Sequence, residues 1–524
     1  MNYADLFRVT LPETALEIAA LIVLIVDLGF LRKAALKVRV AVAALLGVAG
    51  CGAALWALQA SAGAGYSYDG AFLLAQSGYI AAAQSGILIL TSLTLLLLID
   101  SDFTKHVGEF VAVVLMAASG GLLVAAAQDL LVIFVGLELL SLSLYIMTAF
   151  AKSSAKSAEA ALKYYLFGGM SAAFLLFGFS YLYGITGSTN LNQVFSYLST
   201  DGGGSFPLLI VAVVLVFSGL GFKVAAVPFY LWAPDTYEGA PAPAAAFIAS
   251  VSKVASFTLL LTIGFASEHI LISYPAGTSW WTRFGIGLGD SIGSLRFELL
   301  WMIILVVSAS LSMVVGNLAA LAQTNVRRLL AYSAVAHAGY LLIGLPFSNG
   351  EVVAHLPFSN LDRTTNAVLY YILTYGLTTI GAFGVVSVVE RATGSDRLDS
   401  FLGLHKRNPL LAAVLGVLFL SLAGIPPLVG FWAKFNLFAA VLGVSAGPVP
   451  FALVALAVAM SAVSLYYYLQ VLKRAYVMPA VDETPIKAHP VTMGVLVAIA
   501  AAVVVLGCFP ALLQRWIESF YPIL

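Results

Sequence analysis

The sequence predicts an all-α polytopic membrane protein of about fourteen transmembrane helices, and three observations support this prediction. The 524-residue chain is 61% hydrophobic and only 10% charged, and its mean hydropathy of +1.00 lies far outside the range of soluble domains. Apolar runs recur with about twenty residues each, the length of helix that crosses ~30 Å of hydrocarbon. Basic residues concentrate in alternate loops, as the positive-inside rule requires.

The expected spans follow one another along the whole chain, separated mostly by short connections. The segment 60–77 is expected to be a Gly/Ser/Tyr-rich loop, and 267–297 is the longest polar connection. The spans lie near residues 12–31, 38–60, 78–99, 107–127, 130–150, 159–185, 206–233, 241–266, 298–320, 328–346, 364–390, 409–444, 449–476 and 491–511.

Loop charge orients the chain. With the N-terminus outside, the inside loops and adjoining span ends hold 16 basic residues and the outside segments hold 5. We therefore expect both termini to face the periplasm or its equivalent. The inside set is Arg32, Lys33, Lys37, Arg39, Lys105, Lys152, Lys156, Arg327, Arg328, Arg391, Arg397, Lys406, Arg407, Lys473, Arg474 and Lys487, and the outside set is Arg8, Arg283, Arg296, Arg363 and Arg515.

Composition also argues against several classes of function. The formal net charge is zero, which suggests neither a nucleic-acid nor an acidic partner. Cys51 and Cys508 each lie in an apolar run, so a disulfide framework, an Fe–S cluster or a zinc site is not supported. The N-terminus carries Asp5, Arg8 and Glu13 instead of a basic region with a cleavage site, and it reads as a first membrane helix.

Two lysines interrupt spans that are otherwise fit for lipid. Lys223 precedes Pro228 by five residues, and Lys253 lies among small and hydroxylated residues in the next span. A charged side chain near the bilayer centre costs at least ~2.5–3.5 kcal/mol, so such residues usually mark an ion pathway. Proline removes a helix hydrogen bond, and broken helices are tolerated in membranes where they line a polar cavity. We expect a discontinuous helix at Pro228.

Two further candidates, Glu138 and Lys163, have plausible structural roles as well. Glu138 lies in mid-span and either bonds to nearby hydroxyl groups or needs a cationic partner, for which Lys223 is the obvious choice. Lys163 follows Glu159 by four residues, a spacing that places both side chains on one helix face. A local ion pair is therefore an alternative to a role for Lys163 in transport.

The second half of the chain contributes His337 and Lys434. A lone histidine in an apolar helix can be a satisfied core residue, but His337 can also exchange protons near neutral pH. Lys434 shares a span with Pro426 and Pro427, which again suggests a broken helix. We expect Lys253 and His337 on one water-connected path near the bilayer centre. Three carboxylates at span boundaries are expected to be interfacial: Asp129, Asp235 and Glu238.

The positions of the two broken spans suggest an inverted repeat. Five spans separate Lys223 from Lys434, an odd number, so the two units would have opposite orientations, a feature of transporters. Burial disfavours the charged form of a lysine and an approaching carboxylate restores it, so such a lysine can load and release a proton. The expected divisions are an N-terminal three-helix segment at 1–106, a first repeat at 107–266, an extramembrane loop at 267–297, a second repeat at 298–477, and a C-terminal helix with a short tail at 478–524.

Five sequence blocks form a recognisable set. They are LPETALEI at 11–18, ALKYYLFG at 161–168, PFYLWAPDTYEGAP at 228–241, RRLLAYSAVAHAGY at 327–340 and GIPPLVGFWAKF at 424–435. These blocks resemble the antiporter-like membrane subunits of NADH-quinone oxidoreductase (respiratory complex I), in particular the subunit N type, and the resemblance covers nearly the whole chain. A glutamate in place of Lys434 would be typical of another subunit type, and a long lateral helix after the last span of a third.

The resemblance implies two proton half-channels joined by a central axis of Glu, Lys and His residues. Glu138 and Lys223 resemble the modulating pair, Lys253 and His337 the central relay, and Lys434 the terminal carrier. The resemblance also implies that this chain carries no redox centre. NADH, FMN, Fe–S clusters and quinone are expected in partner subunits of the membrane-bound complex, which include other antiporter-like subunits.

Two other classes remain open at this stage. The first is a subunit of a multi-subunit cation/proton antiporter, which would use the same lysines. The second is a structural membrane scaffold, against which the ionisable residues within the spans of both repeats argue.

Overall fold

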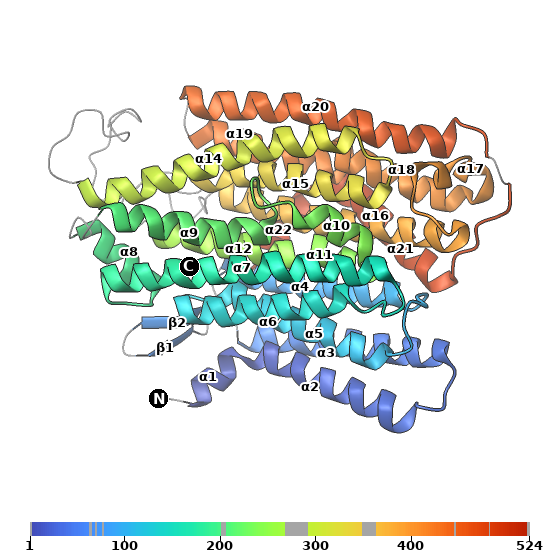
Figure 1. The fold of residues 1–524 in the computed structure, drawn as a ribbon, viewed down its shortest axis with the longest axis horizontal. Coiled ribbons are helices and arrows are strands. Elements are labelled where there is room, and N and C mark those ends of the chain that lie inside the picture. The colour runs from blue at the N-terminus through green and yellow to red at the C-terminus, as the bar shows by residue number, and fades with distance from the viewer. Residues whose placement is uncertain are drawn as a thin grey trace.

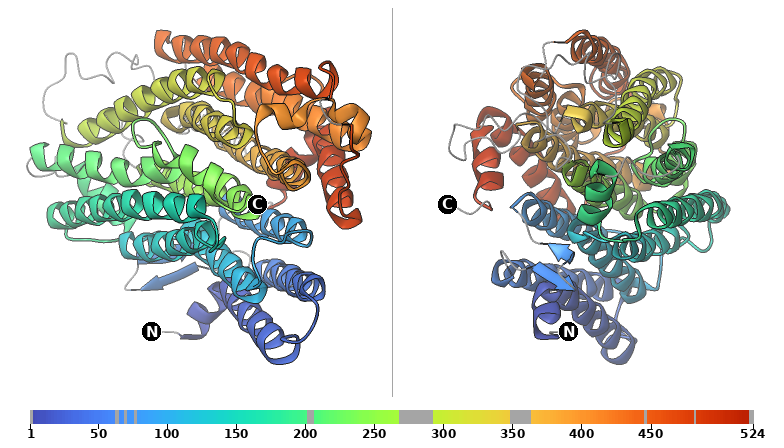
Figure 2. Two further views of the ribbon diagram at one scale, coloured as in Figure 1. Left: turned by 45° about the vertical axis from the view of Figure 1, so that its right-hand side comes forward. Right: turned by 90° about the vertical axis from the view of Figure 1, so that its left-hand side faces the viewer.

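Long apolar helices run back and forth across the molecule and pack side by side in several layers (Figure 1). The computed structural model describes residues 3–61, 65–68, 71–75, 78–200, 206–267, 292–347, 363–444, 447–480 and 483–520. The N-terminal helices form one edge of the bundle and α20 the opposite edge, as the end-on view shows (Figure 2). The C-terminal helices α21 (Pro490–Cys508) and α22 (Ala511–Glu518) return to pack against α4 (Gly78–Leu98).

The first part of the bundle holds the N-terminal helices and the candidate residues Glu138 to Lys253. Its other elements are α1 (Tyr3–Val9), α2 (Leu11–Ile25) with a π-helix (Val26–Phe30), α3 (Leu36–Ala60), β1 (Gly65–Tyr68), β2 (Ala71–Ala75), α5 (Val107–Ala126), α6 (Leu130–Thr148), α7 (Ala155–Thr186), α8 (Leu191–Thr200), α9 (Phe206–Val224), α10 (Trp232–Gly239), α11 (Ala242–Ala249) and α12 (Val251–Ser267).

The second part holds His337 and Lys434. Its elements are α14 (Ile292–Leu321), α15 (Val326–Gly344), a 3₁₀ turn (Leu345–Phe347), α16 (Arg363–Thr393), a second 3₁₀ turn (Leu398–Phe401), α17 (Leu404–Arg407), α18 (Pro409–Ala423), α19 (Val429–Val444) and α20 (Pro448–Tyr476). The expected connection at 267–297, with Arg283, lies mostly outside the described residues.

The helices agree with the predicted class of protein. Within the described ranges, eleven helical segments are long and apolar enough to cross a membrane. The other three expected spans coincide with α2, with α15 and with the pair α18–α19, which are shorter or more polar. The number of crossings and the proposed repeats remain predictions.

The segment 60–77 differs from the loop that the sequence suggested. It contains a two-stranded antiparallel hairpin, β1–β2, with an irregular register between Tyr66 and Ser67. Tyr and Phe favour extended backbone, which accounts for the local preference. The short helices α1, α8 and α22 also lie outside the predicted spans.

Both predicted helix breaks are present. The first lies between the end of α9 at Val224 and the start of α10 at Trp232, and the second lies between α18, ending at Ala423, and α19, starting at Val429. Pro228 and Pro427 each follow a cis peptide bond. A third break, at Ser250 between α11 and α12, contains no proline and was not predicted.

Glycines allow α14 and α15 to approach closely. A Cβ atom at Gly316 would lie 2.5 Å from the backbone nitrogen of Ala336, and one at Gly339 would lie 2.7 Å from that of Met313. Neither distance is sterically possible without a shift of backbone. This close contact fixes the helix that carries His337 against its neighbour.

We therefore expect Gly316→Ala to destabilise the bundle by about 1–3 kcal/mol, the usual cost of overpacking a close contact. The matched control is Gly184→Ala on α7, where a Cβ would meet nothing within 4 Å. Thermal unfolding of the purified protein in detergent measures both. Equal melting temperatures for the two variants would contradict the close contact.

Candidate functional site

Lys253 and His337 lie near the middle of the bundle. Each is eleven residues beyond the start of its span, Lys253 after Ala242 and His337 after Val326. At 1.5 Å per residue this is about 17 Å, roughly half of a ~30 Å hydrocarbon layer. Both side chains are buried, with exposed fractions of 1% and 3%.

Lys223 is the first buried cation. Its Nζ donates a hydrogen bond to Ser141 Oγ on α6, and it lies 6.0 Å from the centre of the Tyr145 ring. Ser141 follows Glu138 by three residues, so the two share a helix face. No ion pair joins Lys223 to Glu138 within the described ranges. The hydrogen-bond partner of Lys223 is therefore the hydroxyl group of Ser141, one helical turn from the expected partner Glu138.

Lys253 is anchored to the helix of His337. Its Nζ donates to the carbonyl oxygen of Ala334 at 2.6 Å, and it lies 5.7 Å from the centre of the Tyr375 ring. Ala334 precedes His337 by three residues, about one turn of α15. The structure therefore brings these two candidate residues to the same turn of one helix.

His337 is surrounded by tyrosines. Tyr371 Oη lies 2.8 Å from Nδ1, and Tyr468 Oη lies 3.4 Å from Nε2. The Tyr375 ring packs against the imidazole with centroids 4.7 Å apart. Both ring nitrogens thus have a hydroxyl partner, which satisfies a buried imidazole and also supplies groups that can exchange a proton with it.

These tyrosines were not singled out from the sequence. The signal that could have revealed them is the clustering of phenols in two apolar spans, at Tyr370, Tyr371 and Tyr375 and again at Tyr466 to Tyr468. A buried phenol needs a hydrogen-bond partner, so such clusters indicate a polar interior.

Lys434, on α19, binds carbonyl oxygens at the C-terminal end of α18 and a hydroxyl group on α20. Its Nζ donates to the carbonyl oxygens of Leu422 at 3.2 Å and Ala423 at 3.1 Å, and to Ser461 Oγ at 2.8 Å. In a continuous helix those two carbonyls would accept from the residues four positions later. Those residues are Pro426 and Pro427, which have no N–H. The prolines therefore free the two oxygens that bind the lysine.

A small cavity lies beside His337 and next to the residues around Lys434. Its volume is about 10 Å³, close to the minimum for one water molecule. Leu422, whose carbonyl accepts from Lys434, lies in its wall together with His337. The other residues of the wall are Tyr371, Thr374, Tyr375, Thr378, Ser421, Gly430 and Ala433.

Lys163 does not join this group. Its Nζ lies 2.8 Å from Glu159 and 2.8 Å from Asp235, and its side chain is 40% exposed. The local ion pair with Glu159 is therefore present, with a second partner on α10. Asp129 caps the N-terminus of α6 by accepting from the backbone nitrogen of Leu131. Its place agrees with the interfacial interpretation.

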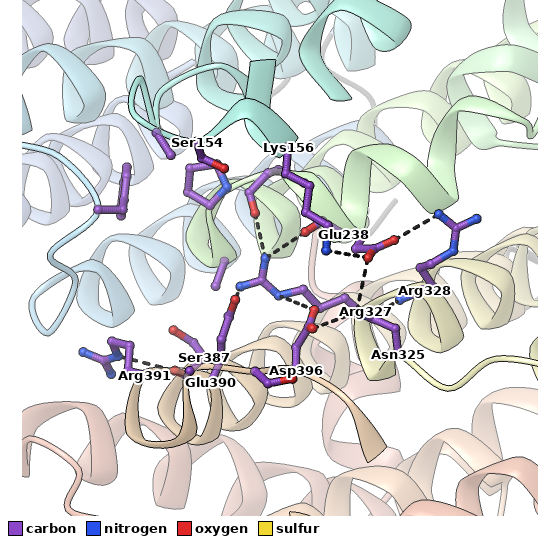
Figure 3. A pocket seen from close by; sticks show the side chains of 18 of the residues that line it. Ser154, Lys156, Glu238, Asn325, Arg327, Arg328, Ser387, Glu390, Arg391 and Asp396 are labelled. Carbon is purple, nitrogen blue, oxygen red and sulfur yellow. Dashed lines mark hydrogen bonds and ion pairs between the residues drawn. The ribbon is translucent and has the colours of Figure 1, made fainter. Parts of the chain in front are cut away.

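Asp235 belongs to a dense group of charges that we call the basic end, formed around Lys156, Arg327, Arg328 and Arg391. A cavity of about 800 Å³ opens there, lined by the start of α15, the end of α16 and the α10–α11 connection. Figure 3 shows Arg327 and Arg328 pointing in different directions from adjacent positions.

Arg328 and Arg327 fasten α10 to the second half of the molecule. Arg328 pairs with Asp235 at 2.6 Å and Glu238 at 3.0 Å. Arg327 donates to the carbonyl of Ala240 at 2.8 Å and pairs with Glu390 on α16 (Figure 3). Charges from three helices are thus joined where α10 ends and α15 begins.

Burial would raise the pKa of Glu238, but its ion pairs with Lys156 and Arg328 outweigh this and hold the pKa below its usual value. A carboxyl group whose pKa is lower in the folded state stabilises the fold above its unfolded pKa. That contribution is lost as pH falls through the folded value. The ion pairs of Glu238 at the basic end therefore stabilise the fold at neutral pH, and this stabilisation is lost in acid.

We expect Arg327→Met to destabilise the protein by about 3 kcal/mol, since it leaves Glu390 partly buried without its cation. The control is Arg391→Met, which removes a more exposed pair with Asp100 and should cost about 0–1 kcal/mol. Denaturation of the detergent-solubilised protein measures both. A cost for Arg327→Met no larger than the control would show that the buried pair is not important for stability.

Within the described ranges, no group of three or more His, Cys, Asp or Glu side chains could hold a metal ion. The candidate site consists of buried amines, an imidazole and hydroxyl groups. Together with the fold, these define a polytopic membrane protein that carries buried titratable groups in its helix bundle, the class to which ion and proton transporters belong.

Comparison with known sequences identifies the family. The family model described as "NADH:quinone oxidoreductase/Mrp antiporter, TM" matches residues 127–286 and 292–463, and the chain belongs to this family. It is 46% identical over 530 residues to NADH-quinone oxidoreductase subunit N 2 of Acidobacterium capsulatum, covering 99% of both chains. It is 35% identical to subunit N of Anaeromyxobacter sp., covering 97% of this chain and 95% of the relative.

Solved structures share the fold. A chain of respiratory complex I from Thermus thermophilus with bound aureothin is 31% identical, with a TM-score of 0.73, covering 96% of this chain and 98% of that one. A chain of the Mrp complex from Dietzia sp. is 20% identical, with a TM-score of 0.76, covering 98% of this chain and 51% of that one. At this identity the second likeness concerns the fold alone.

Proposed function

We propose that the chain is the subunit N type of antiporter-like subunit in an NADH-quinone oxidoreductase and that it moves protons across the membrane. The observation that carries this proposal is the set of buried titratable side chains, Lys223, Lys253, His337 and Lys434, each held by neutral partners. Electron transfer from NADH to quinone, with FMN and Fe–S clusters, would take place in partner subunits. The membrane would be the bacterial inner membrane, with both termini in the periplasm.

Neutral partners suit a proton carrier. A lysine beside a fixed carboxylate stays charged, whereas one held by hydroxyl and carbonyl oxygens can also exist as the neutral amine. Lys434 has no carboxylate within ion-pair distance among the described residues. Glu138 lies one helical turn from Ser141, the hydrogen-bond partner of Lys223. A shift of α6 by one turn would change the electrostatic effect of Glu138 on Lys223.

The two broken helices support a pair of half-channels. We infer that residues 107–266 form one inverted repeat and residues 298–477 the other, with Lys223 and Lys434 beside the break in each. Lys253 and His337 would pass protons between them through Tyr and Thr side chains and water in the small cavity.

The alternative function is a subunit of a multi-subunit cation/proton antiporter. The likeness to the Mrp complex, at 20% identity, favours it in fold only, whereas the subunit N relative from Acidobacterium capsulatum is 46% identical over 530 residues. A purely structural scaffold does not explain the buried lysines, because each costs at least ~2.5–3.5 kcal/mol near the bilayer centre and such residues usually mark an ion pathway.

We expect Lys223→Met and Glu138→Gln to reduce proton pumping and coupled NADH oxidation by about tenfold while the complex still assembles. Lys223→Met removes the lysine whose charge state can change, and Glu138→Gln removes the negative charge that influences its protonation. Fluorescence quenching in inverted membrane vesicles measures pumping, and immunoblotting measures abundance. Lys152→Met, an exposed lysine in the α6–α7 connection, is the control. Normal pumping by a well-assembled Lys223→Met complex would remove Lys223 from the mechanism.

Lys434→Arg tests whether this lysine releases its proton. Guanidinium does not deprotonate in proteins, so the variant keeps the charge but should still lose most of the pumping. Lys434→Ala tests only the need for a cation and should also lose it. Both are measured in the same vesicles at normal complex abundance. Full pumping by the Arg variant would mean that Lys434 holds a fixed charge and carries no proton.

A further inference from the structure

The two hydroxyl partners of His337 come from helices far apart in the sequence. Tyr371 belongs to α16 and lies at Nδ1, and Tyr468 belongs to α20 and lies at Nε2. All three residues are buried. A ring with a hydroxyl at each nitrogen can accept a proton at one nitrogen and release the other proton from the opposite side.

The two sides of the ring lead to different surroundings. Tyr468 shares a hydrogen bond with Ser333, the residue beside Ala334, whose carbonyl holds Lys253. Tyr371 lines the small cavity that Leu422 also borders, and the Leu422 carbonyl accepts from Lys434. Tyr468 is therefore linked through Ser333 to the residue that holds Lys253. Tyr371 borders a cavity whose wall includes both Leu422, which binds Lys434, and Tyr375, whose ring lies 5.7 Å from Lys253 Nζ.

We propose that Tyr468 and Tyr371 are the relay residues that load and unload His337, one at each nitrogen. This inference rests on the proposed proton-translocating function. In one direction, the Lys253 ammonium gives a proton to the Ser333 oxygen and becomes a neutral amine, the Ser333 proton passes to the Tyr468 oxygen, and the Tyr468 proton passes to Nε2. The Nδ1 proton passes to the Tyr371 oxygen, whose own proton leaves to a water molecule in the cavity. Each phenol ends neutral, and one proton has crossed the imidazole.

A neighbouring tyrosine provides a matched control. Tyr370, adjacent to Tyr371, donates to the carbonyl of Leu506 at 3.4 Å. It is buried, but its hydroxyl is not bonded to His337 in the described structure. Tyr467 is not a control, because its hydroxyl interacts with Ser333 and Tyr468 as well as with Asn317.

The test compares Tyr371→Phe and Tyr468→Phe with Tyr370→Phe in the assembled complex. Proton pumping and NADH oxidation are measured in inverted membrane vesicles and normalised to complex abundance. We expect the two relay variants to lose at least about tenfold in pumping and the control to stay within about twofold of the parent. An equal loss in all three variants would indicate packing alone and would overturn the relay.

A more conservative change separates the relay from packing. Fluorotyrosine introduced at position 371 or 468 keeps the phenol and nearly its size but makes the hydroxyl more acidic. A relay predicts an altered pumping rate and an altered pH profile at these positions and no change at 370. Unchanged rates and pH profiles at 371 and 468 would overturn the proposal even if the Phe variants fail to assemble.

His337→Gln distinguishes this inference from the proposed function. If that variant stops pumping while both relay Phe variants pump normally, only the tyrosine relay fails. If His337→Gln itself pumps normally at full abundance, the central path through His337 fails and the relay with it. Loss in His337→Gln, Tyr371→Phe and Tyr468→Phe, with a normal control, is the result that the relay predicts.

Discussion

The cost of placing charge in hydrocarbon is the constraint on which the rest of this structure depends. A cation at mid-membrane is tolerated only where polar atoms replace its water. At Lys434 those atoms are the carbonyls of Leu422 and Ala423, left free because Pro426 and Pro427 cannot donate to them. The helix break and the buried lysine are therefore one feature: the prolines that end α18 create the site that the amine occupies.

The molecule separates its fixed charges from its switchable ones. At the basic end, Arg327 and Arg328 are paired with carboxylates on α10 and α16 beside a large cavity, and these pairs hold helices together. In mid-bundle, the hydrogen bonds of Lys253 and His337 in the described structure are to carbonyl and hydroxyl groups. Fixed ion pairs give rigidity, whereas neutral partners leave the charge state of a group free to change.

The two kinds of site are linked through shared helices. Arg327 lies at the start of α15 in the basic end, and His337 lies about three turns later on the same helix. Helix α10 follows the helix break beside Lys223. A movement of α10 would therefore act on both the break and the helix of the central histidine. Tight glycine contacts between α14 and α15 make this part of the bundle a poor candidate for independent flexing.

The sequence by itself determined the membrane class, the positions of most of the long apolar helices and both proline breaks, because hydropathy and proline chemistry act locally. It did not reveal the break at Ser250, the β1–β2 hairpin, the hydroxyl partner of Lys223 or the tyrosines around His337. Ser141 lies 82 positions from Lys223, and Tyr468 lies 131 positions from His337. No local pattern encodes such pairs: they exist only because helix packing brings distant faces together, so only the tertiary structure decided what each buried charge touches.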